Sequence, residues 1–277
     1  MKVSQIWSYP VKSMVGSTIE TGFLDISGLR GDRTWATRDL DRGGIRGAKK
    51  IGGLMRLEAR RLDGDDVEIL LPDGRKVATT DPEIDAVLSA HLGCNVRLER
   101  LRPADDLDHY RRGAPDSDDF MAELRAVFGR DEDEPLPDLG QFPPVVMEFE
   151  SPPGTYHDCW PLLVMSTSAL RAVAESLPES VIDVRRFRPT FVIDTGETPG
   201  HPEFGWTGRR FTVGGAVIEI VGPCPRCVMV TRAVGRDIPE DRAVLRHIVR
   251  DLDQNVGAYA TVIEPGSFAT GDPFVEV

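Results

Sequence analysis

Apolar and polar residues alternate over short runs in the first third of the chain, and glycine, proline or aspartate separates the runs. This period of two is typical of half-buried β-strands, in which successive side chains point to opposite faces. It predicts strands over residues 3–8, 18–26, 33–37, 55–62 and 67–71. Asp73 and Gly74 follow the last of these strands and predict a hairpin turn.

One helical pattern interrupts these strands. Asp81 is expected as its N-cap and Pro82 at its first position, apolar residues recur at helical spacing over 84–92, and Gly93 predicts the end. The second half predicts strands over 162–165, 182–194 and 211–220, and helices over 168–177 and 239–252. Many short strands with few helices predict a β-rich α+β fold of barrel-like sheets, rather than a doubly wound parallel sheet.

Length and composition limit the class of protein. A chain of 277 residues is long enough for one large domain or two joined ones. No run is long and apolar enough to cross a bilayer, and the first residues lack the apolar stretch of a signal peptide. Four cysteines without framework spacing fit a reducing compartment. We therefore expect a soluble, cytoplasmic protein with no membrane partner.

The net charge of −12 argues against nucleic acid as a partner. Twelve acidic and four basic residues fall within 105–138, so this segment alone carries a net charge of −8. Only 120–128 shows helical periodicity inside it. The segment is interpreted as a solvated insertion or lid between two halves, with a docking surface for a basic redox partner as the alternative.

Cys224 and Cys227 form a Cys-Pro-Arg-Cys motif directly after the predicted strand over 211–220. Structural zinc would need four ligands, and no second pair accompanies the motif. A redox dithiol would precede a helix, whereas the β-branched alternation over 228–231 predicts a strand. Two buried structural thiols are the plainest alternative. A thiolate bound to a transition metal accounts best for two prolines and an arginine around the thiols.

Basic residues gather in a few short stretches. Lys12 follows the first strand, Arg33 opens another, and 46–50 is a basic, glycine-containing loop. In the predicted strand over 182–194, Arg186 and Arg188 would project to one face. Internal salt bridges would explain single arginines, but the group as a whole favours a phosphate-bearing ligand, because guanidinium groups match phosphate geometry.

Five short motifs, in this order, resemble the MOSC family: YPVKS at 9–13, GDR at 31–33, FRP at 187–189, CPRC at 224–227 and GDP at 271–273. The family includes the mitochondrial amidoxime-reducing component and its bacterial relatives. The resemblance implies three parts: a MOSC N-terminal β-barrel domain over 1–104, an acidic insertion or linker over 105–150, and a MOSC β-barrel domain with a few flanking helices over 151–277.

The resemblance also implies a molybdenum cofactor, a pterin dithiolene with a phosphate, whose metal is bound by one protein cysteine. By its place in the motif that ligand is Cys227, with Cys224 as a supporting residue or a bystander. Arg186 is added to the cofactor-binding residues by strand geometry alone. Four residues match family positions that hold the pterin and its phosphate: Lys12, Ser13, Arg33 and Arg188.

Two positions depart from the amidoxime reducers. Thr190, which we include among the cofactor-binding residues, stands where they have asparagine, and Cys159-Trp160 stands where they have threonine and serine. Both departures bear on the substrate more than on the cofactor.

The reaction that the resemblance implies is two-electron reduction of an N-hydroxylated small molecule by oxo transfer at the metal. Asp158 is the expected catalytic proton carrier, with His157 and Asp32 as further candidates. For each of the three, a role as a helix cap or salt-bridge partner is the alternative, and it is the commoner one for such residues. The chain has too few cysteines for an iron–sulfur cluster beside Cys227 and no flavin or nicotinamide motif, so an external electron-transfer protein or reductase is expected.

Two alternatives to this reaction stay open. In the first, Cys227 or Cys224 carries a persulfide and the protein is a sulfurtransferase or sulfur carrier. In the second, the protein holds the molybdenum cofactor without catalysis and delivers it to another enzyme.

Overall fold

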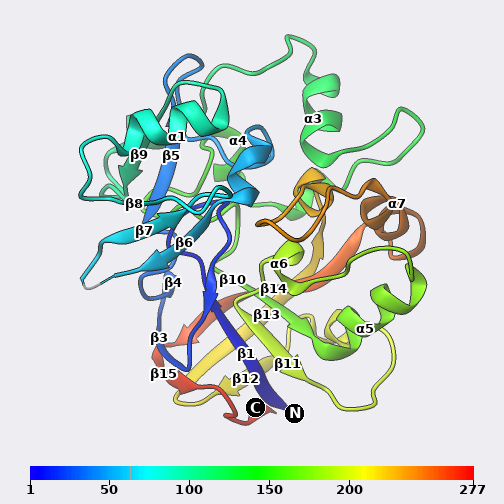
Figure 1. Cartoon of the computed structure of the whole chain (residues 1–277). Coiled ribbons are helices and arrows are strands. Elements are labelled where there is room, and N and C mark those ends of the chain that lie inside the picture. Colours follow the sequence, from blue (N-terminus) through cyan, green and yellow to red (C-terminus); the bar gives the residue numbers. More distant parts are fainter. Residues whose placement is uncertain (63) are drawn as a thin grey trace.

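The computed structural model describes residues 1–62 and 64–277, and its largest element is an eight-stranded sheet. The strand order is β16-β12-β13-β14-β10-β11-β1-β2, and β10 and β11 run parallel within it. Figure 1 shows this sheet in the lower lobe, beside both termini. Its strands are β1 (Lys2–Ser8), β2 (Ser17–Thr18), β10 (Leu162–Ser166), β11 (Phe191–Asp194), β12 (Arg210–Val213), β13 (Ala216–Pro225), β14 (Asn255–Glu264) and β16 (Phe274–Glu276).

Smaller sheets build the rest of the strand content. A three-stranded sheet beside the large one has the order β15-β3-β4, from β15 (Gly266–Ala269), β3 (Thr21–Asp25) and β4 (Gly28–Leu29). The upper lobe of Figure 1 pairs β5 (Trp35–Asp39) with β9 (Val96–Arg100). It also contains the 3-10 turn η1 (Gly52–Arg56), β6 (Glu58–Arg61), β7 (Val67–Leu70), β8 (Lys76–Ala78) and helix α1 (Ile84–Leu92).

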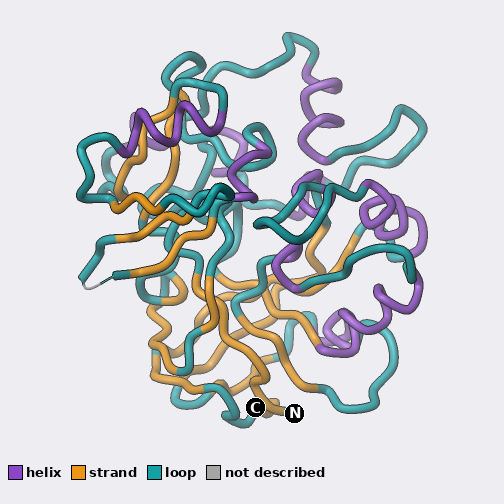
Figure 2. Tube along the Cα trace, viewed as in Figure 1, coloured by secondary structure: helices purple, strands orange, loops and turns teal. Residues whose placement is uncertain are grey.

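The remaining helices are short and lie mostly toward one side of the molecule (Figure 2). They are α2 (Leu107–Tyr110), α3 (Phe120–Phe128), η2 (Leu139–Gln141), α4 (Val145–Glu148), α5 (Thr167–Ser176), α6 (Val184–Phe187), η3 (Pro202–Trp206), η4 (Val228–Thr231) and α7 (Arg242–Asp251). Among the described residues, no helix combines the length and apolar character needed to cross a membrane. The predicted β-rich α+β fold is confirmed.

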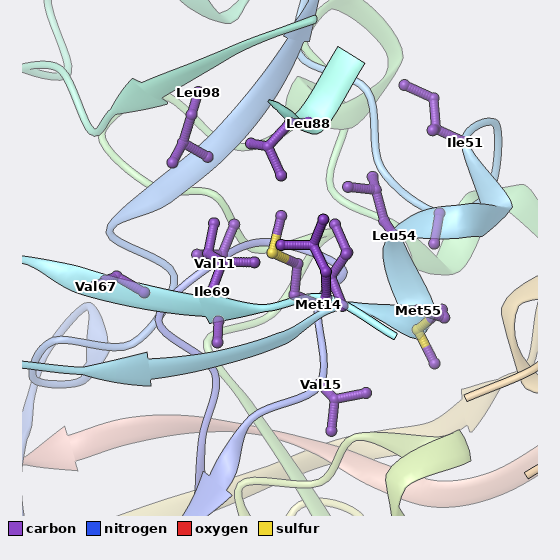
Figure 3. Packing of buried hydrophobic residues seen from close by; sticks show 14 of the residues in the cluster. Val11, Met14, Val15, Ile51, Leu54, Met55, Val67, Ile69, Leu88 and Leu98 are labelled. Carbon is purple, nitrogen blue, oxygen red and sulfur yellow. The ribbon is translucent and has the colours of Figure 1, made fainter. Parts of the chain in front are cut away.

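The core of the upper lobe holds the chain at the middle of the YPVKS motif and just after it. Val11 and Met14 are fully buried there and pack with Leu54 and Ile69 (Figure 3). Met229, from the other half of the chain, joins the same cluster. The two lobes therefore share this core, and the chain on either side of Lys12 is fixed by packing.

The acidic segment is anchored on both sides. Asp116 pairs with Arg46 (2.8 Å) and Lys50 (3.1 Å) of the upper lobe, and Asp131 pairs with Arg246 of α7 (2.7 Å). Part of the −8 charge is thereby matched by basic side chains of the two lobes.

One predicted strand, over 228–231, is wrong, and another, over 182–194, is confirmed only at its end. Residues 182–194 form the helix α6 and then β11. The Asp183 side chain accepts from the Arg185 N–H (2.8 Å) and caps the helix. The helix ends at Phe187, and Arg188, the residue before Pro189, adopts a left-handed conformation (φ 59°). Residues 228–231 form the 3-10 turn η4, in which Met229 and Val230 are buried by tertiary contacts that override β-propensity.

Other differences concern element boundaries. The helix predicted to begin at Pro82 begins at Ile84, because Asp81 closes a separate turn by accepting from the Glu83 N–H (2.9 Å). The run 18–26 is split between β2 and β3, the first two residues of 55–62 belong to η1, and the strand expected over 33–37 begins at Trp35. The last helix spans Arg242–Asp251, within the predicted 239–252.

Candidate functional site

The structure gathers residues from distant parts of the chain around one pocket between the lobes. Five of its lining residues are basic and one, Asp158, is acidic, so the pocket reverses the charge of an acidic protein and favours an anionic ligand. Thr190 is not among the lining residues; it is buried, and its backbone N–H donates to the Leu163 carbonyl (2.7 Å). The other expected cofactor-binding and catalytic residues all line the pocket: Lys12, Ser13, Arg33, Asp158, Arg186, Arg188 and Cys227. Asp32, a further candidate proton carrier, is not among the lining residues.

Ser13 adopts a left-handed backbone conformation (φ 68°), which turns the chain into the pocket. Its Oγ accepts a hydrogen bond from the Ala48 N–H (2.9 Å). A Cβ at Gly47 would lie 2.6 Å from this Oγ, so a glycine is required for the basic loop to approach. The Ser13 hydroxyl proton is left free to donate to a ligand.

Asp158 lies between two ammonium groups. Lys12 Nζ donates to Asp158 Oδ1 (2.5 Å) and to the Tyr156 carbonyl (2.9 Å), and Lys49 Nζ lies 3.2 Å from Asp158 Oδ2. Burial raises the pKa of Asp158, but the charges of Lys12 and Lys49 outweigh it and hold that pKa well below its usual range. An ionised Asp158 positions two cations, which favours this role over the delivery of protons.

Arg188 and Arg33 lie against the ring of Tyr9, with their Cζ atoms 4.2 Å and 5.1 Å from its centroid. Arg33 pairs with Asp32, whose Oδ1 also accepts from the Tyr9 N–H (2.5 Å). Arg188 Nη1 donates to the Met14 carbonyl, whereas its buried Nη2 has no hydrogen-bond partner among the described residues. Burial, and then repulsion from Arg33, lower the pKa of Arg188 to about 10. An anion bound in this pocket would offset both the cost of burying the Arg188 guanidinium and its repulsion from Arg33.

Arg186 is held differently from Arg188. It lies in α6 rather than in a strand, so the shared face predicted for Arg186 and Arg188 does not exist. Among the described residues, the Arg186 guanidinium donates only to backbone carbonyls, and these belong to Val181 (2.9 Å), Val230 (3.2 Å), Arg232 (3.1 Å) and Pro239 (2.7 Å). This pattern is typical of a residue that ties segments together.

Three thiols line the pocket, and Cys227 is the least buried of them. Cys224, near the end of β13, is buried and accepts from Arg226 Nη1 (3.1 Å), and burial raises the pKa of its thiol. Burial and the nearby Asp158 raise the pKa of Cys159 to about 12. Cys227 stands at the start of η4 and is the thiol best placed to bind a ligand. Within residues 1–62 and 64–277, no three His, Cys, Asp or Glu side chains form a metal-binding group.

His157 is buried at the pocket, and its Nε2 lies 3.2 Å from the Ser27 carbonyl, which requires a proton on Nε2. Burial, and then repulsion from Arg33 and Lys12, lower the pKa of His157 to about 3. The ring is therefore neutral near pH 7 and offers Nδ1 as an acceptor, so it is unsuited to deliver a proton.

This histidine predicts a pH dependence of stability. Between its ordinary pKa of about 6.5 and about 3, the unfolded chain binds a proton that the folded chain does not, so stability falls as the pH falls. We expect His157→Gln, whose amide can still donate to Ser27, to remove about 1.4 kcal/mol per pH unit from the slope of unfolding free energy between roughly pH 6 and 4. Urea unfolding at several pH values measures it. Equal slopes for the two proteins below pH 6 would contradict the prediction, and equal slopes above pH 7.5 are the control.

Tyr9 and Arg226 line or border the pocket but are not among the site residues predicted from the sequence. Both residues lie inside the YPVKS and CPRC motifs. Their position next to predicted site residues was therefore the only indication of their role in the sequence. The Tyr9 ring faces two guanidinium groups, and its hydroxyl donates to the Pro189 carbonyl (2.9 Å). Arg226 Nη2 donates to the Phe187 carbonyl (2.6 Å) and thereby joins the CPRC and FRP motifs.

Comparison with protein families gives two matches. Residues 1–110 match the MOSC N-terminal beta barrel domain, and residues 152–275 match the MOSC domain. The 41 residues between the matches, 111–151, contain α3 and α4. No curated protein matches the chain.

Solved structures give weaker likenesses. The YuaD protein from Bacillus subtilis is 12% identical over 98% of this chain and 92% of its own, with a TM-score of 0.44. YiiM from Escherichia coli is 20% identical over 43% of this chain, with a TM-score of 0.33, and YiiM from Geobacillus stearothermophilus is 14% identical over 43%, with a TM-score of 0.31. This chain spans 54% of each YiiM chain.

Proposed function

Because the chain belongs to the MOSC family, with a MOSC N-terminal β-barrel domain followed by a MOSC domain, we propose that it is a molybdenum-cofactor-binding oxidoreductase. Its substrates would be N-hydroxylated small molecules, and an external electron-transfer protein or reductase would supply the electrons. The observation that carries the proposal is the pocket itself, in which a thiol stands beside a cationic surface with a buried, unpartnered guanidinium N–H at Arg188.

The residues present fit the cofactor. A phosphate needs several N–H donors and positive charge, and Lys12, Arg33 and Arg188 supply both around one pocket. A metal of this kind needs a soft thiolate ligand, and Cys227 is the most accessible thiol of the pocket. Arg186 would serve indirectly, by fixing the segment that carries Arg188. Thr190 would act through the backbone bond that joins β10 to the FRP motif.

The bound cofactor would supply two-electron oxo transfer, and the chain's own residues would bind, orient and screen the reactants. Asp158 keeps Lys12 and Lys49 at the pocket, where their charge stabilises anions. Neutral His157 offers an acceptor to a substrate N–H or O–H group. The four free cysteines support a reducing, cytoplasmic location.

Molybdenum content and turnover test the proposal together. We expect near-stoichiometric molybdenum, by elemental mass spectrometry, in protein from a host that makes the cofactor. We also expect reduction of benzamidoxime with a reduced viologen as electron donor. Folded protein without molybdenum would contradict the proposal. Molybdenum without turnover of any N-hydroxylated probe would instead indicate a cofactor carrier.

Sulfur transfer is the second candidate, and the grouping of Cys224, Cys227 and Cys159 around one pocket supports it. A persulfide on Cys227 would be stabilised by the cations that surround it, as a thiolate would be. Intact-protein mass spectrometry distinguishes the two functions, because sulfane sulfur bound to Cys227 in the absence of molybdenum would favour transfer.

A further inference from the structure

The acidic segment reaches the CPRC motif through one buried side chain, Arg130. This residue follows α3 and the left-handed Gly129, and it is 5% exposed. Its guanidinium Nη2 donates to the Arg226 carbonyl (3.0 Å) and to Gln254 Oε1 (3.0 Å). A side chain from the segment that links the two lobes thus contacts the residue next to Cys227.

The Arg226 backbone is held from both ends by this arrangement. Its N–H donates to the Gln254 carbonyl (2.8 Å), and its C=O accepts from Arg130. The Arg226 carbonyl belongs to the peptide group that joins Arg226 to Cys227. The plane of this peptide group sets the direction in which the chain enters Cys227, so Arg130 and Gln254 together restrict where the thiol lies.

Arg130 is, like Arg186, a buried cation held by neutral acceptors, but it lies beside the thiol motif. Within the described residues Arg130 donates only to neutral acceptors, the others being the carbonyls of Pro135 (3.2 Å) and Phe128, and no carboxylate pairs with it. A buried cation without a paired anion is unfavourable. Gln254 (φ 71°) and the preceding Asp253 (φ 46°) both adopt left-handed conformations without being glycine. Strain of this kind concentrates at functional sites.

We infer that Arg130 is a positioning residue of the thiol site. Through Arg130 the acidic segment contributes directly to that site, rather than covering it as a lid. Arg130 fixes the peptide group before Cys227 and places a permanent positive charge near the thiol. The role of Cys227 as a metal ligand comes from the proposed function, whereas the fixing of the loop can be tested without any cofactor.

Amide hydrogen exchange of the full chain, produced without the cofactor, tests the inference directly. In peptides covering 222–231, the amides of Arg226 and Val230 are hydrogen-bonded and should be protected. We expect Arg130→Met to speed their exchange about ten- to hundredfold, the range of a hydrogen bond to a charged group. Molybdenum retained by protein from a cofactor-producing host should fall in parallel.

Arg125→Met is the matched control, because Arg125 lies in the same segment and donates to the carbonyls of Asp131 (2.7 Å) and Glu134 (3.0 Å). It should loosen 131–134 without affecting 222–231. If Arg130→Met fails to fold, Arg130→Lys decides, since one ammonium cannot replace the planar fork. Loop exchange within twofold of wild type in the folded variant overturns the inference. Absence of molybdenum from wild type, with faster loop exchange in the variant, would contradict the proposed function alone.

Discussion

Replacing Cys227 by alanine is expected to remove essentially all molybdenum from the purified protein while leaving the fold intact. The thiol is the only group that this substitution deletes, and a partly exposed residue at the start of η4 contributes little to the core. The free energy of unfolding should change by no more than about 1 kcal/mol. Elemental mass spectrometry and urea unfolding measure the two quantities on the same preparation.

Cys224→Ala is the matched comparison. Cys224 is buried, and its removal leaves Arg226 Nη1 without an acceptor, so the expected cost in stability is about 1–3 kcal/mol. Molybdenum should nevertheless be retained in the folded fraction. Equal loss of metal in both variants would favour a dithiol or persulfide, and retention of metal in Cys227→Ala would exclude this residue as the ligand.

Patterning predicted elements well where one face of a strand is buried and the other is exposed. β12 and the first part of β13 alternate in this way, although the single strand predicted over 211–220 is a hairpin of these two strands. In β1 a bulge between Val3 and Gln5 interrupts the alternation. Patterning failed over 182–187 and 228–231, where tertiary contacts bury apolar residues in helical turns. Periodicity cannot separate a short buried helix from a short buried strand.

Four of the five motifs contribute lining residues to the pocket, whereas GDP at 271–273 lies outside it and pairs with Val3 of β1. The motifs located the pocket, but they could not assign roles within it. Arg186 and Arg188 are two residues apart, and only their hydrogen-bond partners distinguish them. The Arg186 guanidinium joins several segments through backbone carbonyls, whereas Arg188 Nη2 has no partner among the described residues. Nothing in the sequence indicated that Arg130 belongs to the site, because it lies in a segment whose composition indicates a solvated surface. Its role depends on a contact with Arg226, 96 residues away.

Replacing Arg188 by methionine is expected to weaken cofactor retention about ten- to hundredfold while changing apo-protein stability little. The substitution loses a hydrogen bond to the Met14 carbonyl and the contact with the Tyr9 ring. It also removes a buried cation that has an unpartnered Nη2 and is repelled by Arg33. In the apo-protein the lost contacts lower stability and the removal of the buried cation raises it, so the two changes oppose each other. A bound phosphate would lose one charge-assisted hydrogen bond, with nothing to offset that loss. Molybdenum and pterin content against ionic strength, with urea unfolding of the apo-protein, give both quantities.

Arg186→Met, two residues away in the chain, is expected to have the opposite result: a large loss of stability and little specific loss of cofactor. The buried Arg186 guanidinium donates to four backbone carbonyls, so its loss should destabilise the protein by about 3 kcal/mol or more, with cofactor retention reduced only as far as the folded fraction falls. If cofactor retention fell in proportion to the loss of stability in both variants, both arginines would have a structural role only. A pocket that kept its cofactor unchanged in Arg188→Met would have to hold the anion through Lys12 and Arg33 alone. The buried Nη2 of Arg188 would then be an uncompensated cost of the fold, since no bound group would supply its partner.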